Sequence, residues 1–214
     1  MDRLQGFGIL QMKKPCNGGS IPSGPAMKPG KIVEKFAVAA KGGKQISVVF
    51  RFPRVSDAKA VLSFINQVRG EAEFLGQRHR ETLASEKKFL RDVLKKMRAR
   101  KKVLVFAKAN GKIIGNATIS ADAAEARSHL GEFGIALLEQ FTGLGIGTRL
   151  GKCVLGLAKT ELKLKLITSF FFSKNARSRA LHARLGFKQY GILPKAMKLK
   201  RGGFDDEVCV YKTI

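Results

Sequence analysis

Two segments rich in β-branched and aromatic residues predict a strand hairpin early in the chain. Residues 31–38 read KIVEKFAV and residues 46–52 read ISVVFRF, with Gly42-Gly43 between them. Residues of these types favour strands, and paired glycines favour a tight turn. Because proline has no backbone N–H to donate, we expect the second strand to end at Pro53.

A helical spacing of hydrophobic residues follows this hairpin. Val61, Ile65 and Val68 recur at positions i, i+4 and i+7, and Ser56 precedes them as the expected helix cap. A second stripe of the same kind predicts a second helix after a polar loop. Its residues are Ser85 as the expected cap and Leu90, Val93, Leu94 and Met97 as the apolar positions.

The middle of the chain predicts a second hairpin, after which strands and helices alternate. Asn110-Gly111 separates the apolar segments 103–107 and 113–119, and this dipeptide tolerates two positive φ angles in a tight turn. Alternation in the second half indicates a mixed sheet with at least one parallel pair of strands. The elements expected there are strands at 133–138 and 164–172, helices at 148–161 and 175–185, and strands near 189–199 and 207–211.

A glycine-rich segment lies between a predicted strand and a predicted helix. Residues 141–148 read FTGLGIGT. Such glycines expose consecutive backbone N–H groups, and the helix N-terminus adds partial positive charge, so a pyrophosphate fits there. The third glycine comes one residue too early for a dinucleotide-binding fingerprint, and Gly151-Lys152 is followed by Cys153, which excludes an NTPase loop. An ordinary strand-to-helix turn is the alternative.

The net charge is the unusual feature of the composition. The 214 residues include 41 Lys and Arg against 16 Asp and Glu, a formal net charge of +25. The excess is spread over the whole sequence, and it favours polyanionic partners such as nucleotide phosphates, RNA or acidic protein surfaces. Adaptation to a cytoplasm of unusual composition is an alternative that needs no partner.

Other features limit the class of protein. Ten of residues 1–30 are Gly or Pro, which predicts a flexible tail before a single domain at 31–214. Cys16, Cys153 and Cys209 are odd in number and far apart, which argues against a disulfide scaffold and for a reducing compartment. The histidines lack metal-ligand spacing, so we expect no metal. No apolar run approaches about 18 residues, so we expect no membrane span and a cytoplasmic location.

Four segments resemble the GNAT superfamily of acyl-CoA-dependent N-acyltransferases. Residues 142–147 (TGLGIG) are similar to its Arg/Gln-x-x-Gly-x-Gly/Ala loop, and residues 175–187 (NARSRALHARLGF) to its Asn...Leu-Tyr-x-x-Leu-Gly-Phe segment. Residues 204–212 resemble its closing strand, and residues 57–75 its two-helix entry. The resemblance covers residues 45–214. It implies a mixed α/β fold with a mostly antiparallel central sheet, flanking helices and one parallel strand pair at the coenzyme A site.

The resemblance implies acetyl-CoA as a cosubstrate. In the family the glycine loop cradles the pyrophosphate, and strand backbone pairs with the pantetheine arm. Thr142 replaces the usual Arg or Gln, which removes a side-chain contact but keeps the backbone donors. The implied coenzyme-binding residues are Leu137, Leu138, Thr142, Gly143, Leu144, Gly145, Ile146, Gly147, Thr148 and Asn175.

The implied reaction is direct attack of a primary amine on the acetyl thioester. It needs a proton acceptor, an oxyanion donor and an acid for the thiolate. Glu132 is the first candidate acceptor, with an exposed edge carboxylate as the alternative reading, and Glu71 and Glu73 are its rivals. The Leu137 N–H is the candidate oxyanion donor. His182 stands where the family has a tyrosine acid, and packing of this residue is the alternative.

Three functions are compatible with these observations. The leading one is an N-acetyltransferase whose acceptor is a primary amine of a protein or small molecule. Because a strongly basic protein repels free cationic amines, an acidic macromolecule or a ribonucleoprotein is the favoured acceptor, and a homodimer is a further expectation. The alternatives are a nucleic-acid- or ribosome-binding protein on the same fold, and a catalytically silent coenzyme A sensor.

Overall fold

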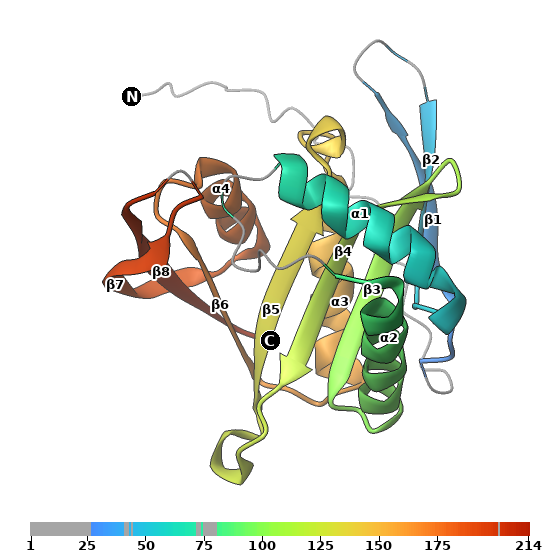
Figure 1. Ribbon diagram of the computed structural model, residues 1–214. Helices are drawn as coiled ribbons and strands as arrows, with labels where there is room; N and C mark the ends of the chain where they lie inside the picture. Colours follow the sequence, from blue (N-terminus) through green and yellow to red (C-terminus); the bar gives the residue numbers. More distant parts are fainter. Residues whose placement is uncertain (1–26, 41–42, 44, 72–73, 75–80, 201) are drawn as a thin grey trace, which may run out of the picture.

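A mixed sheet with helices on both faces forms the body of the protein (Figure 1). Most of the predicted tail and the candidate base Glu73 lie outside the described residues. The computed structural model describes residues 27–40, 43, 45–71, 74, 81–200 and 202–214.

Eight strands make up the sheet in the order β1-β2-β3-β4-β5-β6-β8-β7. Every neighbouring pair is antiparallel except β5 and β6, which run parallel, so the predicted fold class is confirmed. The strands are β1 (Ile32–Ala39), β2 (Gln45–Arg51), β3 (Lys102–Ala109), β4 (Lys112–Ala121), β5 (Leu130–Leu137), β6 (Leu166–Phe172), β7 (Lys188–Lys198) and β8 (Phe204–Thr213).

The helices cover the two faces of the sheet separately. Figure 1 shows α1 and α2 on one face and α3 and α4 on the other. Their apolar stripes pack on the sheet around fully buried residues such as Phe50, Phe106 and Ile119. The α-helices are α1 (Ala58–Glu71), α2 (Leu83–Arg98), α3 (Ile146–Thr160) and α4 (Ala176–Leu185), and the 3₁₀ turns are η1 (Val55–Asp57), η2 (Glu125–Arg127) and η3 (Glu139–Phe141).

The second predicted hairpin is confirmed by its backbone angles. Asn110 and Gly111 have φ angles of 49° and 76° between β3 and β4. Both lie in the left-handed region that this two-residue turn requires.

The prediction that Ser56 caps the first helix is wrong. Ser56 lies inside the 3₁₀ turn η1, and the Arg54 N–H donates to the Asp57 carboxylate over 2.7 Å instead. Buried Arg51 also donates to Asp57, over 2.8 Å from Nη1. These hydrogen bonds and the Arg51 charge hold the pKa of Asp57 below its usual range, although burial opposes them as the largest single effect. The ion pair between the end of β2 and η1 therefore sets where α1 begins.

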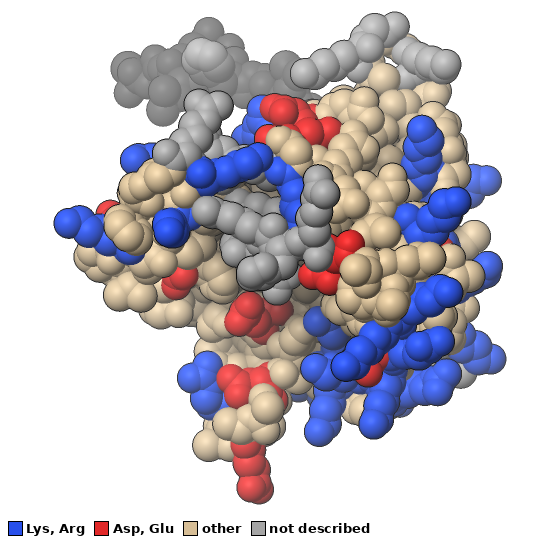
Figure 2. Space-filling model, in the orientation of Figure 1, with Lys and Arg blue, Asp and Glu red and all other residues tan. Residues whose placement is uncertain are grey.

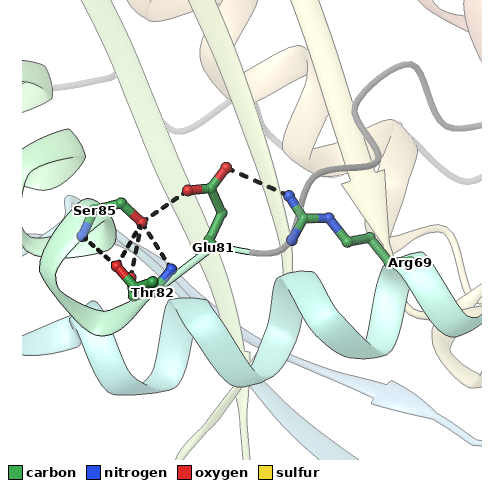
Figure 3. Close-up of polar contacts among 4 residues, drawn as sticks. All are labelled: Arg69, Glu81, Thr82 and Ser85. Carbon is green, nitrogen blue, oxygen red and sulfur yellow. Dashed lines mark hydrogen bonds and ion pairs between the residues drawn. The ribbon is translucent and has the colours of Figure 1, made fainter.

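The cap of the second helix lies three residues before the predicted cap, Ser85. Thr82 is the cap, and its side chain accepts from the Ser85 N–H over 3.1 Å while the Thr82 N–H donates to Ser85 Oγ over 2.9 Å. Ser85 also donates to Glu81, whose carboxylate lies 3.6 Å from Arg69 of α1 (Figure 3). This cluster joins the end of α1 to the beginning of α2.

Candidate active site

The parallel strands β5 and β6 pair over only three residues and then separate. Leu130 to Glu132 pair with Leu166 to Thr168, and no further pairing follows within these two fully described strands. Figure 1 shows the strands diverging from this point. From Glu132 to Leu137, β5 spans about 17 Å. The diverging strands thus have two backbone edges that are not paired with each other, and we call the region between these edges the opening.

The exposed backbone edge of β5 belongs to its odd-numbered residues. The Leu138 N–H donates to the Ile114 carbonyl of β4 over 2.9 Å. Since successive residues of a strand direct their backbone groups to opposite sides, those of Phe133, Ile135 and Leu137 face the opening toward β6. The Leu137 N–H therefore faces β6, and its role as oxyanion donor stays a prediction. Leu138 has its N–H bound to β4 and its carbonyl bound to the Phe141 N–H, so its coenzyme contact stays a prediction that this bonding disfavours.

The glycine loop follows β5 and leads into α3 in the conformation that the motif requires. Gly143 and Gly145 have φ angles of 79° and 77°, and Gly145 is the residue that caps α3. Helix geometry leaves the N–H groups of the first turn, at Ile146, Gly147 and Thr148, without acceptors inside the helix. These donors and the helix dipole suit a pyrophosphate.

Side chains from β1 and α1 tie the glycine loop to the body of the protein. Arg149 in the first turn of α3 pairs with Glu34 of β1 over 2.5 Å and lies 4.0 Å above the ring of Phe36. Glu71, at the end of α1, accepts from the Glu139 N–H of η3 over 2.9 Å. Glu71 thus holds the segment before the loop, and its role as a rival base stays a prediction.

The N-terminus of α4 lies beside the same loop. Arg177 donates to the Glu139 carboxylate over 2.7 Å, which joins α4 to η3. Asn175 caps α4 by accepting from the Ser178 N–H over 3.0 Å. The structure therefore brings Asn175 and residues 142–148 to one end of the opening, although the Asn175 side chain is already engaged in the cap.

Glu132 lies at the narrow end of the opening, in a row of polar residues that the strand register builds. Phe133 contacts His182 of α4, so Glu132 points to the opposite face, the one that α1 and α2 cover. A pocket of about 190 Å³ opens beside it. The polar row consists of Lys102, Ser120, Glu132, Thr168 and Tyr211, from β3 to β8. The pocket is lined by Ser120, Ala121, Asp122, Arg127, Leu130, Gly131, Glu132 and Thr168.

His182 is buried behind the opening, with only 4% of its surface exposed. Its ring contacts those of Phe133, Phe171 and Phe187. Nδ1 lies 2.8 Å from the Ser178 carbonyl oxygen, and Nε2 lies 2.9 Å from the Ser169 hydroxyl.

These contacts decide where the imidazole proton lies at neutral pH. Burial lowers the pKa of His182, although the hydrogen bond to Ser178 acts in the other direction. Because a carbonyl can only accept, the single proton of the neutral ring belongs on Nδ1, and Nε2 accepts. Nε2 then carries no proton for a leaving thiolate. The acid role of His182 stays a prediction that this geometry disfavours, and the packing alternative is favoured.

Ser169 is a site residue that the sequence reading missed. Its hydroxyl lies 3.0 Å from the Phe133 carbonyl oxygen, the first acceptor of β5 beyond the paired residues. It is also within reach of His182, so one side chain links the separating strands to α4. The only signal in the sequence was a polar pair, Thr168-Ser169, inside an otherwise apolar strand.

The two described cysteines have no contact with the candidate site residues among the described hydrogen bonds and ion pairs. Cys153 is buried in α3, and desolvation raises the pKa of its thiol to about 12. Cys209 is half-buried and free, and Cys16 lies outside the described residues. Over the described part of the chain, no cluster of three or more potential metal ligands occurs. None of the helices described above is both long and apolar enough to span a membrane.

Comparison with known proteins gives matches to one family. The model of the acetyltransferase (GNAT) domain matches residues 47–188. No curated protein sequence matches the chain.

Solved structures share the fold at low sequence identity. A GNAT-family acetyltransferase from Streptococcus pneumoniae is 22% identical, with a TM-score of 0.72 over 78% of this chain and 99% of the other. The ribosomal-protein-S5-alanine acetyltransferase of Vibrio fischeri is 21% identical, with a TM-score of 0.71 over 78% and 92% of the two chains. The putative acetyltransferase yncA of Salmonella typhimurium, solved with acetyl-CoA, is 17% identical, with a TM-score of 0.68 over 78% and 93%.

Proposed function

The chain belongs to the GNAT family and is an acetyl-CoA-dependent acetyltransferase, and we propose that its acceptor is a primary amine of a protein. The amine attacks the acetyl thioester directly, and no protein nucleophile takes part. A protein acceptor is supported by the structural similarity to an enzyme that acetylates a ribosomal protein, and by the net charge of +25, which repels small cationic amines. A cytoplasmic location and a homodimer stay predictions.

The separation of β5 and β6 is the observation that supports binding of acetyl-CoA here, because the two ends of the opening differ in their chemistry. The wide end holds the glycine loop and the first turn of α3, which suit a pyrophosphate. The narrow end holds Glu132 at the last paired position. The pantetheine arm of acetyl-CoA is an extended chain with amide groups, and it would pair with the backbone of Ile135 and Leu137 on its way between the two ends.

Glu132 is the residue that we propose as proton acceptor. Its side chain is exposed and borders the pocket, so an amine can reach it directly or through a water molecule. The Leu137 N–H remains the proposed oxyanion donor. Ser169 acts as a positioning residue, because its hydroxyl lies within hydrogen-bond distance of both the Phe133 carbonyl oxygen of β5 and His182 of α4.

Ligand-induced stabilisation tests the coenzyme site. Purified protein is melted with acetyl-CoA, with coenzyme A and with ATP as a polyanion control, at low and at high salt. At a hundred times the dissociation constant a specific ligand stabilises by about 2.7 kcal/mol, which raises the midpoint by several degrees. We expect this shift with the two coenzymes in both salts. Equal, salt-sensitive shifts with all three ligands would contradict the site, whereas selective shifts without acetylation of any peptide would indicate a silent coenzyme A sensor.

Glu132→Gln tests the proposed base. The amide keeps the size of the side chain but cannot accept the ammonium proton, so kcat at pH 7 should fall about a hundredfold or more while the coenzyme-induced shift stays unchanged. Glu125→Gln, at an exposed carboxylate in η2, is the matched control and should keep wild-type turnover. Unchanged turnover in Glu132→Gln would remove this residue from the mechanism.

A further inference from the structure

The exposed side of α2 and the turn after it carry a dense group of positive charges. Figure 2 shows this group over α2, at the lower right of the molecule. Asp92 is the one acidic residue in the segment 87–101, and Glu86, just before this segment, is buried. We call the group the α2 basic face, and its eight exposed residues are Lys87, Lys88, Arg91, Lys95, Lys96, Arg98, Arg100 and Lys101.

The α2 basic face is held rigidly by the other side of the same helix. Leu90, Val93, Leu94 and Met97 are buried against the sheet, so α2 cannot rotate its cations away from solvent. The helix is about 24 Å long. None of the ion pairs found within the described residues involves these eight cations. Their charges therefore remain available to a partner.

The chemistry of the α2 basic face distinguishes among polyanionic partners. A helix that lies in a membrane interface inserts its apolar side into the lipid, but that side of α2 is buried in the core. A specific protein interface has an apolar centre, and Phe89, 44% exposed, is the only large apolar side chain exposed between residues 87 and 101. A nucleic-acid backbone needs neither, because a row of cations along one line is enough to bind its phosphates.

The end of the α2 basic face lies close to the proposed base. Lys101 precedes Lys102, which begins the polar row Lys102, Ser120 and Glu132 on neighbouring strands. Two strand spacings separate Lys102 from Glu132, or about 10 Å. Glu132 also points to the face of the sheet that carries α2. A polyanion bound on this side would lie next to the opening at which the acceptor amine arrives.

We propose that the α2 basic face binds the phosphate backbone of RNA and so recruits acceptor proteins that are bound to RNA. The choice of RNA over DNA rests on the proposed function, because structural similarity relates the chain to an enzyme that acetylates a ribosomal protein. Binding is independent of RNA sequence, since lysine and arginine contacts to phosphates read no bases.

Fluorescence anisotropy with a labelled RNA duplex of about 20 base pairs tests this proposal by measuring affinity at several salt concentrations. Each phosphate contact contributes about 0.9 to the slope of log K against log salt concentration. The test variant changes Lys87, Lys88, Lys95 and Lys96 to Gln, and the control changes Lys152, Lys159, Lys163 and Lys165, which are exposed on α3 and the turn after it, to Gln. Both variants lose the same charge. The α2 variant should lose more than tenfold in affinity and about 3 to 4 in salt slope. The control should change by less than about twofold, with less than about 1 in slope.

Several outcomes would overturn the proposal. Equal losses in both variants would mean that the overall field, and not the α2 basic face, attracts RNA. Tighter binding of a DNA duplex of the same sequence would exclude RNA as the partner, and equal competition by polyglutamate would indicate an acidic protein instead.

The melting of both variants with acetyl-CoA is measured separately. Failure of the coenzyme shift in the wild type contradicts the proposed function whatever the RNA result, and loss of RNA binding with an intact shift contradicts only this inference.

Discussion

The hydroxyl of Ser169 has one proton and two acceptors, His182 Nε2 at 2.9 Å and the Phe133 carbonyl oxygen at 3.0 Å. With a neutral imidazole protonated on Nδ1, Ser169 can donate to only one of the two at a time. With an imidazolium both links form, because Nε2–H donates to Ser169 while Ser169 donates to Phe133. The desolvation of His182 opposes that state. Burial therefore keeps the His182 ring neutral, although the charged ring would allow both of these hydrogen bonds to form.

This balance predicts a pH-dependent stability that belongs to His182. Its folded pKa is depressed, so the unfolded state binds more protons once the pH falls below the ordinary value of 6.5, and stability is lost on acidification. From about pH 7.5 to about pH 5.5 the wild type should lose up to about 1.4 kcal/mol more unfolding free energy than His182→Phe. Urea unfolding at the two pH values measures the difference.

Parallel losses in the wild type and His182→Phe would show that His182 does not carry this dependence. His182→Tyr supplies the test of the acid role. Activity that is restored by Tyr and lost with Phe would support an acid, whereas equal activity in all three proteins would support packing.

At the scale of elements, local patterns in the sequence predicted the helices and hairpins but not their partners. The Asn110-Gly111 turn and the stripe from Leu90 to Met97 depend on neighbouring residues only, and both are found as expected. The Arg51–Asp57 ion pair and the burial of His182 depend on contacts that no local period encodes. Alternating strands and helices predicted a parallel pair of strands, and the family resemblance implied its place at the coenzyme A site, but neither gave the length of three residues over which β5 and β6 pair.

The glycine loop offers a prediction at the same scale. Gly145→Ala places a side chain at a φ of 77°, where the left-handed conformation costs about 1 to 2 kcal/mol, although no atom lies within 4 Å of the added carbon. Gly147→Ala has no such strain, and its added carbon would lie 3.9 Å from Leu137 and Leu181, an ordinary contact. Urea unfolding without ligand should show a loss for Gly145→Ala and little change, or a gain, for Gly147→Ala.

Equal stability of the two variants would indicate that the backbone at Gly145 adopts another conformation in solution. In that case the geometry proposed for the pyrophosphate site would have to be revised, because it depends on Gly145 as the cap of α3.

At the scale of the whole molecule, the structure changes the interpretation of the charge. The sequence shows the net charge of +25 spread along the chain. Folding exposes eight of the cations together on the α2 basic face. Such a concentration of like charge destabilises the folded state through repulsion, since salt-screened interactions still act over about 8 Å at physiological ionic strength.

Salt should therefore stabilise the protein, and the α2 basic face should account for a measurable part of the effect. The unfolding midpoint should rise between about 50 mM and about 500 mM NaCl. At the lower concentration the α2 quadruple Lys→Gln variant should melt higher than the α3-side control of equal net charge. A control that gains as much as the α2 variant would show that the repulsion is spread evenly over the surface.

The order of strands in the sheet bears on how the chain acquires this structure during synthesis. Each of β2 to β5 pairs with the strand before it in the sequence, and short connections join β1 to β2, β3 to β4 and β4 to β5, whereas α1 and α2 lie between β2 and β3. Contacts between neighbours in sequence close short loops and form quickly. The step that follows is different, because β6 can join β5 only after α3 has crossed the sheet, and β7 reaches the sheet only through β8. The opening proposed for the coenzyme is thus bounded by β5, which has its sheet partner early in synthesis, and β6, which joins only after α3, so the proposed site cannot form before β6 has been made.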